Sequence, residues 1–131
     1  MAFEHPVRVY WEDTDAGGIV FYANYLKFFE RARTEWLRSL GLNQGELRES
    51  EGGFFVVSET SVRYLQPARL DDELLVTARL ESAGRASLTI VQSALRGSDT
   101  LCEGTIRIGW VDAATLKPGR IPASILETLN R

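Results

Sequence analysis

The residues best suited to chemistry lie in one short acidic stretch near the N-terminus. Glu12, Asp13 and Asp15 precede Gly17 and Gly18, and a long segment with helical apolar spacing follows. The start of such a helix presents free backbone N–H groups and the positive end of the helix dipole, which suit a developing oxyanion. The glycines let the backbone approach a substrate closely, because they carry no Cβ. A carboxylate beside an oxyanion site is a geometry for acyl transfer.

The same stretch allows two other interpretations. The acids could be solvated loop residues, with Asp13 or Asp15 holding a turn through backbone amides. Asp13 and Asp15 also match the first and third positions of an EF-hand calcium loop, with Gly18 as its central glycine. The calcium match fails at the last position, because Asn24 cannot replace a bidentate glutamate. No metal is therefore expected.

Other catalytic groups are scarce in the chain. One histidine, His5, and one cysteine, Cys102, exclude an intramolecular disulfide and any metal site built from several such residues. His5 precedes the first predicted strand and no G-x-S-x-G sequence occurs, so a Ser-His-Asp triad is not expected. Cys102 falls at a position that suits a small core residue. Carboxylates, hydroxyls, backbone amides and arginines remain.

Composition sets the broad class of protein. The 131 residues are 44% hydrophobic and 25% charged, with a net charge of -3, so we expect one globular domain over residues 1–131. The slight acidic excess argues against nucleic-acid binding. The sequence has no apolar run long enough for a membrane helix, and its first residues lack the pattern of a signal peptide. We therefore expect a cytoplasmic protein.

Apolar periodicity predicts the helices that must position the acidic stretch. Spacings of three and four predict a long helix from about Tyr25 to Leu40, with Asn24 as its N-cap. Gly41 is expected to end this helix in the left-handed conformation. Asn43 is expected to cap a short second helix, which Gly52 and Gly53 would end.

The remaining chain alternates with a period of two. A short terminal helix is expected to begin at Pro122, and breaks at residues 84–85 and 97–99 predict hairpins. The predicted fold class is α+β, with a five-stranded antiparallel sheet packed on the long helix. The predicted strands are residues 6–11, 54–65, 73–83, 87–96 and 100–112.

The acidic stretch resembles a known signature. The residues EDTDAGGIV (12–20), together with Tyr25, are similar to the signature of the 4-hydroxybenzoyl-CoA thioesterase branch of the hotdog-fold enzymes. More closely, they resemble the acyl-CoA thioesterases associated with the Tol–Pal system (the YbgC-like group). Residues 29–35, 64–72 and 85–88 support the match, which spans nearly the whole chain.

This resemblance implies a hotdog fold and an acyl-CoA thioesterase that needs no cofactor. It implies a homodimer or a tetramer made of two dimers, with active sites at the dimer interface. The family's catalytic aspartate falls on Asp15. Its oxyanion donor falls on the backbone amide near Tyr22, where histidine is common in the Tol–Pal-associated group. Association with the Tol–Pal system or a lipid-synthesis complex is a further implication.

Candidates for substrate binding come partly from the resemblance and partly from the residues themselves. Arg85 aligns with a basic position that contacts the nucleotide in the family, and Arg63 is a second candidate for the phosphates of coenzyme A. Gly17, Gly18 and Asn24 are candidates for contact with the thioester, although helix capping explains Asn24 equally well. Further arginine candidates, each of which could equally be a solvated surface residue, are Arg69, Arg96 and Arg107.

Two structural roles follow from the same stretches. Asp72 is expected to anchor the turn that contains Pro67. The acyl pocket has four aromatic candidates, at least two of which suit the core better: Phe21, Tyr22, Phe54 and Phe55.

The residues leave the mechanism of Asp15 open. The carboxylate would either attack the thioester carbonyl, giving a mixed anhydride, or activate a water molecule. The alternative function is a non-catalytic protein that binds acyl thioesters or belongs to an envelope or lipid-synthesis complex. Asp15 favours the enzyme, because a binding module has no need of a carboxylate beside an oxyanion site.

Overall fold

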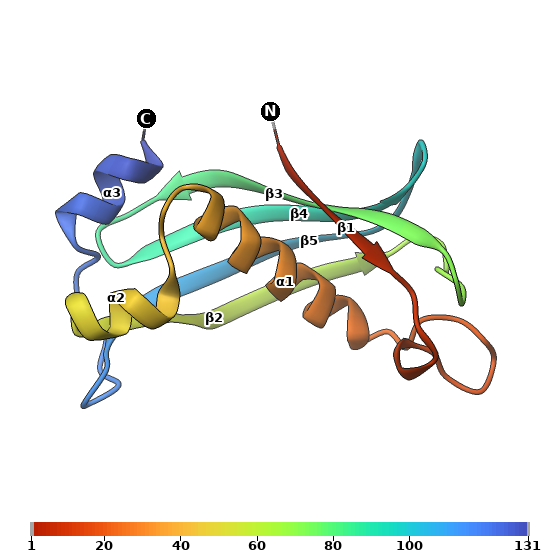
Figure 1. The fold of residues 1–131 in the computed structure, drawn as a ribbon, viewed down its shortest axis with the longest axis horizontal. Coiled ribbons are helices and arrows are strands. Elements are labelled where there is room, and N and C mark those ends of the chain that lie inside the picture. Colours follow the sequence, from red (N-terminus) through yellow and green to blue (C-terminus); the bar gives the residue numbers. More distant parts are fainter. Residues whose placement is uncertain (1, 131) are drawn as a thin grey trace.

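Five strands form one antiparallel sheet in the computed structural model, which describes residues 2–130 (Figure 1). The strand order is β1-β3-β4-β5-β2, so β1 and β2 are the edges. This arrangement confirms the predicted α+β class and the antiparallel sheet. The strands are β1 (Phe3–Arg8), β2 (Gly53–Tyr64), β3 (Glu73–Ala83), β4 (Ser87–Arg96) and β5 (Asp99–Asp112).

One long helix lies across a face of this sheet (Figure 1). Helix α1 (Asn24–Ser39) contacts β1, β3 and β4, and its buried face includes Phe28, Phe29 and Ala32. Two short helices, α2 (Gln44–Ser50) and α3 (Ala123–Leu129), lie near the other end of the sheet from the acidic loop. The central helix wrapped by a sheet is the hotdog arrangement that the resemblance implies.

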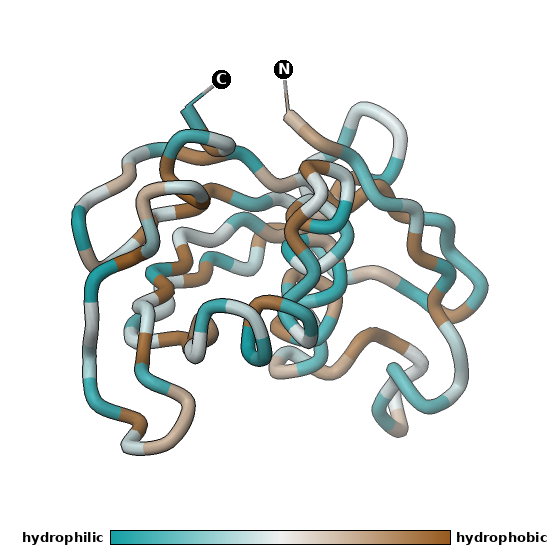
Figure 2. Tube along the Cα trace, turned by 60° about the vertical axis from the view of Figure 1, so that its left-hand side comes forward, coloured by the Kyte–Doolittle hydropathy of each residue, from teal (hydrophilic) through white to brown (hydrophobic). Residues whose placement is uncertain are grey.

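Alternating strand residues build the core against α1. In β4, Leu88, Ile90, Gln92 and Ala94 are buried, and the residues between them are partly exposed. Figure 2 shows the strands arching over α1, with hydrophobic and hydrophilic residues alternating along them. The period of two in the sequence therefore reports which side chains face the helix.

The strand boundaries agree with the sequence except at the first strand. The predicted bounds of β3 and β4 are confirmed, and those of β2 and β5 differ by one residue. The expected strand over residues 6–11 is wrong, because β1 ends at Arg8 and the 3₁₀ turn η1 (Trp11–Asp13) follows. The Asp13 carboxylate accepts a hydrogen bond from the Tyr10 N–H at 2.8 Å, which closes this turn and leaves Trp11 exposed.

The helix ends show one confirmed prediction and two corrections. Gly41 has a φ of 83°, and the Leu42 N–H donates to the Leu37 carbonyl at 2.9 Å, so the left-handed ending of α1 is confirmed. Asn24 is not the cap of α1: Ala23 is the capping residue, and the Asn24 side chain is engaged elsewhere. Pro122 precedes α3 rather than beginning it.

Asn43 confirms the prediction for α2. Its side chain accepts hydrogen bonds from the Gly45 and Glu46 N–H groups. Within residues 2–130, no helix is long and apolar enough to cross a membrane, and no group of three or more His, Cys, Asp or Glu side chains could hold a metal ion.

Candidate active site

Asp15 lies at the tip of a tight turn between η1 and α1. The turn is closed by a hydrogen bond from the Asp15 N–H to the Ile19 carbonyl at 2.9 Å and by a β-bridge between Thr14 and Val20. One carboxylate oxygen of Asp15 accepts a hydrogen bond from the Gly17 N–H at 2.8 Å. The other carboxylate oxygen accepts no hydrogen bond from residues 2–130. The exposed carboxylate is thus oriented by its own turn and keeps one oxygen open.

The two predicted glycines have different roles in this turn. Gly18 has a φ of 77°, a left-handed conformation that an L side chain rarely adopts. At Gly17, a Cβ would lie 3.2 Å from the Asp15 carboxylate oxygen. Gly18 therefore permits the turn, and Gly17 leaves room for the carboxylate.

Asp13 and Asn24 meet beneath the turn, and both are buried. The Asn24 Nδ2 donates to one carboxylate oxygen of Asp13 at 2.8 Å, and the Tyr10 N–H donates to the other at 2.8 Å. The Asn24 side-chain amide is thus directed at Asp13.

Tyr22 stands at the start of α1 with its side chain largely exposed. Its neighbour Phe21 donates its N–H to the Asp13 carbonyl at 3.0 Å. Within residues 2–130, the backbone N–H of Tyr22 donates no hydrogen bond, and no side chain caps the helix. A free amide at the positive end of a helix is a suitable donor to an oxyanion.

An aromatic cavity of about 230 Å³ lies beside Tyr22, and Tyr25, Tyr64, Leu65 and Pro67 share its walls. The rings of Tyr22 and Tyr64 meet edge to face, with centroids 6.1 Å apart. Burial raises the pKa of Tyr25 and of Tyr64, so both phenols stay neutral at physiological pH. Only Tyr22 among the four aromatic candidates lines this cavity.

Within one chain, Phe54 and Phe55 do not line this cavity. They lie at the start of β2, whereas Tyr64 ends the same strand, roughly 30 Å away at about 3.3 Å per residue. Phe55 is buried against Trp110, and Phe54 lies beneath the guanidinium of Arg48. Both side chains thus belong to the opposite end of the sheet.

A second loop, residues 65–72, supports the acidic turn from outside. The Val20 N–H donates to the Ala68 carbonyl at 2.8 Å, and Ile19 forms a β-bridge with Arg69. The Tyr25 hydroxyl accepts a hydrogen bond from the Ala68 N–H at 3.1 Å. The backbone of the second loop therefore joins the turn with Asp15 to the Tyr25 side chain of α1.

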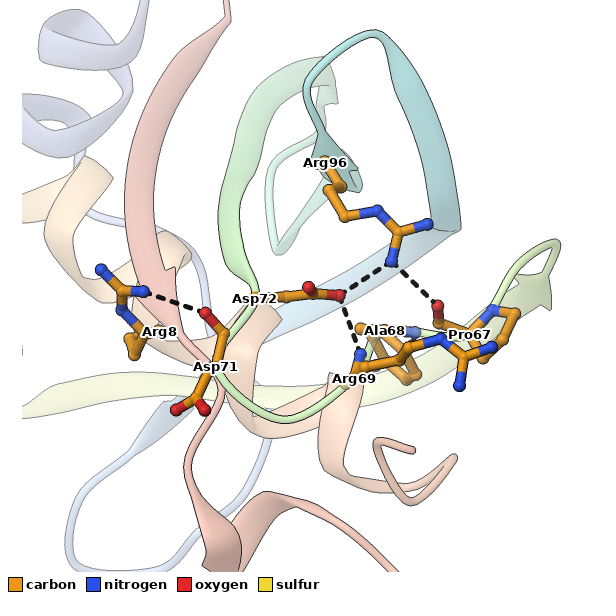
Figure 3. Close-up of polar contacts among 8 residues, drawn as sticks. Arg8, Pro67, Ala68, Arg69, Asp71, Asp72 and Arg96 are labelled. Atoms are coloured by element: carbon orange, nitrogen blue, oxygen red, sulfur yellow. Dashed lines mark hydrogen bonds and ion pairs between the residues drawn. The ribbon is translucent and has the colours of Figure 1, made fainter. Parts of the chain in front are cut away.

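Asp72 anchors this second loop (Figure 3). Its carboxylate accepts hydrogen bonds from the Arg69 N–H at 2.9 Å and the Arg96 guanidinium at 2.8 Å, and Arg96 also donates to the Pro67 carbonyl at 3.3 Å. The predicted anchoring of the Pro67 turn is confirmed, through Arg96. Partial burial acts to raise the pKa of Asp72, but these donors outweigh it and lower the pKa.

The arginine candidates are dispersed. Arg63 is exposed on β2 and pairs with Glu103 at 3.6 Å, and Arg107 contacts Ser87. Arg85 lies in the β3–β4 turn, at the end of the sheet opposite the acidic turn (Figure 1). A single chain therefore does not bring Arg85 near Asp15.

Sequence reasoning missed three features of the site. For the Asp13–Asn24 contact, the sequence offered one indication: the two polar residues lie eleven positions apart and flank the predicted turn and helix start. For the structural role of Arg96 and the place of Tyr64 in the cavity wall it offered none, because both depend on how distant strands are paired.

The comparisons with known proteins agree with this geometry. The model of the thioesterase-like superfamily matches residues 9–129. The acyl-CoA thioesterase YbgC of Haemophilus influenzae is 42% identical over 123 residues, which cover 94% of this chain and 90% of that protein. The acyl-CoA thioester hydrolase YbgC of Escherichia coli O6:H1 is 43% identical over 125 residues, covering 95% of this chain and 92% of that protein.

A solved structure supports the same assignment. The crystal structure of a probable thioesterase from Bartonella henselae matches with a TM-score of 0.89 at 34% identity, covering 93% of this chain and all of that chain. The fold and these relatives together define a thioester hydrolase of the hotdog type. The chain belongs to the thioesterase-like superfamily.

Proposed function

We propose that this protein hydrolyses acyl-CoA thioesters, with Asp15 as the reacting carboxylate and the backbone N–H of Tyr22 as the oxyanion donor. The observation that carries this proposal is the pairing of two unsatisfied groups on adjoining segments. One Asp15 oxygen and the Tyr22 amide are both free within residues 2–130, although the backbone around them is hydrogen-bonded. Polar groups left open in an ordered site are suited to a ligand.

The reaction needs little beyond these two groups. The thioester carbonyl oxygen accepts a hydrogen bond from the Tyr22 amide, and the carbonyl carbon is attacked by the Asp15 carboxylate or by a water that Asp15 deprotonates. The C–S bond breaks, and coenzyme A leaves as a thiolate that takes up a proton. In the covalent route, water then hydrolyses the mixed anhydride. Both routes release one carboxylic acid and regenerate Asp15.

The aromatic cavity is the proposed site of the acyl group. Ile19, Val20 and Tyr22 lie on its walls and also belong to the segment between Asp15 and α1. An acyl group in the cavity would therefore place its thioester next to both reacting groups. The apolar and aromatic lining favours acyl groups over free coenzyme A.

A homodimer would complete the site. Edge strand β2 pairs only with β5 among the described strands, and its residues Val56 and Val57 are exposed by 37% and 51%. An open edge with exposed valines favours pairing with another strand. Two copies of β2 in antiparallel register would set the Gly53 end of one beside the Tyr64 end of the other.

This pairing would also give Arg85 a role. Arg85 lies at the same end of the sheet as Gly53, because Ser87 pairs with Gly109 and Gly53 pairs with Asp112. In the antiparallel dimer, Arg85 of a second copy approaches the end of this chain that carries Asp15 and Tyr64. Arg85, and Arg63 on the edge strand itself, would there meet the phosphates of coenzyme A.

Hydrolysis of an acyl-CoA panel, followed by thiol release, tests the proposal. The wild-type protein should release coenzyme A from at least one ester, and Asp15→Asn should lower kcat by about 10²–10⁴-fold. Glu4→Gln is the control for loss of a carboxylate, because Glu4 is also exposed but lies on β1, the edge of the sheet opposite β2. Tight binding of CoA esters without hydrolysis would instead favour the non-catalytic alternative.

A further inference from the structure

The proposed site has two halves that come from different segments. The carboxylate half is the turn at Asp15, and the amide half is the backbone at Tyr22, before the first residue of α1. Attack on a carbonyl bound to the amide requires the two halves to keep a fixed spacing. An error of about 1 Å can cost about 10² in rate.

A buried side-chain contact joins these halves. The Asn24 Nδ2 donates to Asp13 at 2.8 Å, which ties the first residue of α1 to the residue two positions before Asp15. Backbone hydrogen bonds extend this contact on both sides: the Phe21 N–H donates to the Asp13 carbonyl at 3.0 Å, and the Asn24 N–H donates to the Phe21 carbonyl at 2.8 Å. Tyr22 lies inside this closed ring of contacts.

Neither side chain faces a substrate, although Asp13 also closes the turn at η1. Asp13 is 4% exposed and Asn24 is 6% exposed, so neither polar group is open to a substrate in this chain. Both Asp13 carboxylate oxygens are occupied, by Asn24 and by the Tyr10 N–H at 2.8 Å. Helix capping does not explain Asn24, because it lies inside α1.

We propose that the hydrogen bond between Asp13 and Asn24, here called the Asp13–Asn24 link, sets the spacing between the Asp15 carboxylate and the Tyr22 amide. This inference rests on the proposed function. Asp13 and Asn24 are then positioning residues, and neither touches the reacting atoms. Their loss lowers kcat and leaves KM nearly unchanged, because the acyl cavity is built largely from other residues.

Exchanging the two side-chain types tests the link. Asn24→Asp removes the amide donor and sets two carboxyls against each other in a buried site, so the link is lost once both are ionised. The fall in kcat is therefore measured across a pH series and evaluated at its alkaline end, where neither carboxyl keeps a proton to donate. The double variant Asp13→Asn with Asn24→Asp restores it with reversed polarity: the new amide donates to position 24, and its oxygen still accepts the Tyr10 N–H. We expect kcat to fall about 10²-fold in N24D, with KM within about threefold, and to recover in the double variant.

Two further variants keep the test decisive. Asn24→Ala removes the donor without adding a charge, and should lower kcat about tenfold if N24D fails to fold. Asn43→Asp is the matched control: it is the same substitution at the start of α2, where the Asn43 side chain accepts backbone hydrogen bonds and aspartate is an equally good cap. Wild-type kcat in folded N24D and N24A, or a double variant as impaired as N24D, would overturn the proposal.

Amide hydrogen exchange separates this inference from the proposed function. The Phe21 N–H should exchange at least about tenfold faster in N24D than in the wild type, and should regain protection in the double variant. A wild-type protein that hydrolyses no CoA ester would refute the proposed function, and the exchange pattern would still report on the link. Unchanged exchange at Phe21 in N24D would refute the link itself.

Discussion

Among the buried polar contacts of α1, the one at the middle of the helix and the one at its start join it to different parts of the protein. At the middle of the helix, the Arg33 guanidinium donates to the Gln92 side chain at 2.9 Å, and Gln92 donates to the carbonyls of Phe29 and Thr77. At the start of the helix, Asn24 donates to Asp13. The Arg33–Gln92 contact joins α1 to the sheet, whereas the Asp13–Asn24 link joins α1 to a loop.

These two contacts show how one helix can contribute to both stability and catalysis. Arg33 carries a charge into the core, and burial lowers its pKa while Glu30 offsets part of this effect. Such a group is costly to leave unpaired, so Gln92 contributes to stability. The link at Asp13 lies outside the hydrophobic core and should contribute to the geometry of the site.

The largest expected effect on stability is at Gln92. Gln92→Leu leaves the buried Arg33 guanidinium without its acceptor, and should lower the free energy of unfolding by about 3 kcal/mol. Urea unfolding measures this loss, and kcat of the folded enzyme should stay close to the wild-type value. The double variant Arg33→Met with Gln92→Leu should recover most of the stability, because the buried charge is then removed and only the Phe29 and Thr77 carbonyls lose a donor. A strong fall in kcat in folded Q92L would erase the distinction between the two contacts.

A smaller effect on stability is expected at Asp72, whose carboxylate joins a loop to the sheet through Arg96. Asp72→Asn removes the charge that pairs with Arg96 and should cost about 1 kcal/mol near neutral pH, since both side chains are partly exposed. Because folding lowers the pKa of Asp72, its contribution is present above the unfolded pKa of about 3.9 and is lost as the pH falls through the folded value.

Unfolding curves of the wild type and D72N at several pH values test this linkage. The difference between the two should be constant from pH 7 to pH 5 and should shrink below about pH 4. If the difference instead grows as the pH falls, folding does not lower the pKa of Asp72. Arg96→Met removes the other partner of the same ion pair. The loss in the free energy of unfolding for the double variant should be no larger than the sum of the two single losses.

The smallest expected effect is at Gly17. Gly17→Ala brings a Cβ to 3.2 Å from the Asp15 carboxylate, which must shift by a few tenths of an ångström. We expect kcat to fall by about fivefold, with the midpoint of thermal unfolding nearly unchanged. Gly45→Ala is a close geometric match, since its Cβ would lie 3.3 Å from the Asn43 side-chain oxygen, and it should leave kcat unchanged. Equal effects of the two variants on kcat would contradict the placement of Asp15 in the site.

Much of the fold could be predicted because its signals are local. The ending of α1 at Gly41 and Leu42, the cap at Asn43 and the bounds of β3 and β4 depend on residues within a few positions of one another. Predictions failed where a distant contact decided the conformation. Asn24 reads as a helix cap in the sequence, but its side chain donates to Asp13, eleven residues earlier.

The candidate site divides in the same way. The sequence indicated the Asp15 turn, the two glycines and the amide near Tyr22, since all lie within one continuous segment. It could not indicate that Tyr64 joins Tyr22 in a cavity wall, or that Phe55 packs against Trp110 of β5. Those positions follow from the strand order, which places β2 at the edge beside β5.

The sequence by itself determined the element types, the acidic turn and the restriction of chemistry to carboxylates, amides and arginines, because these depend on local periodicity and residue type. Only the tertiary structure decided that Asp13 faces Asn24, that Arg96 anchors the second loop and that Arg85 lies opposite Asp15. The reason is physical. Strand pairing and burial bring together residues that are far apart in the chain. The periodicity of the sequence does not indicate which strands will pair.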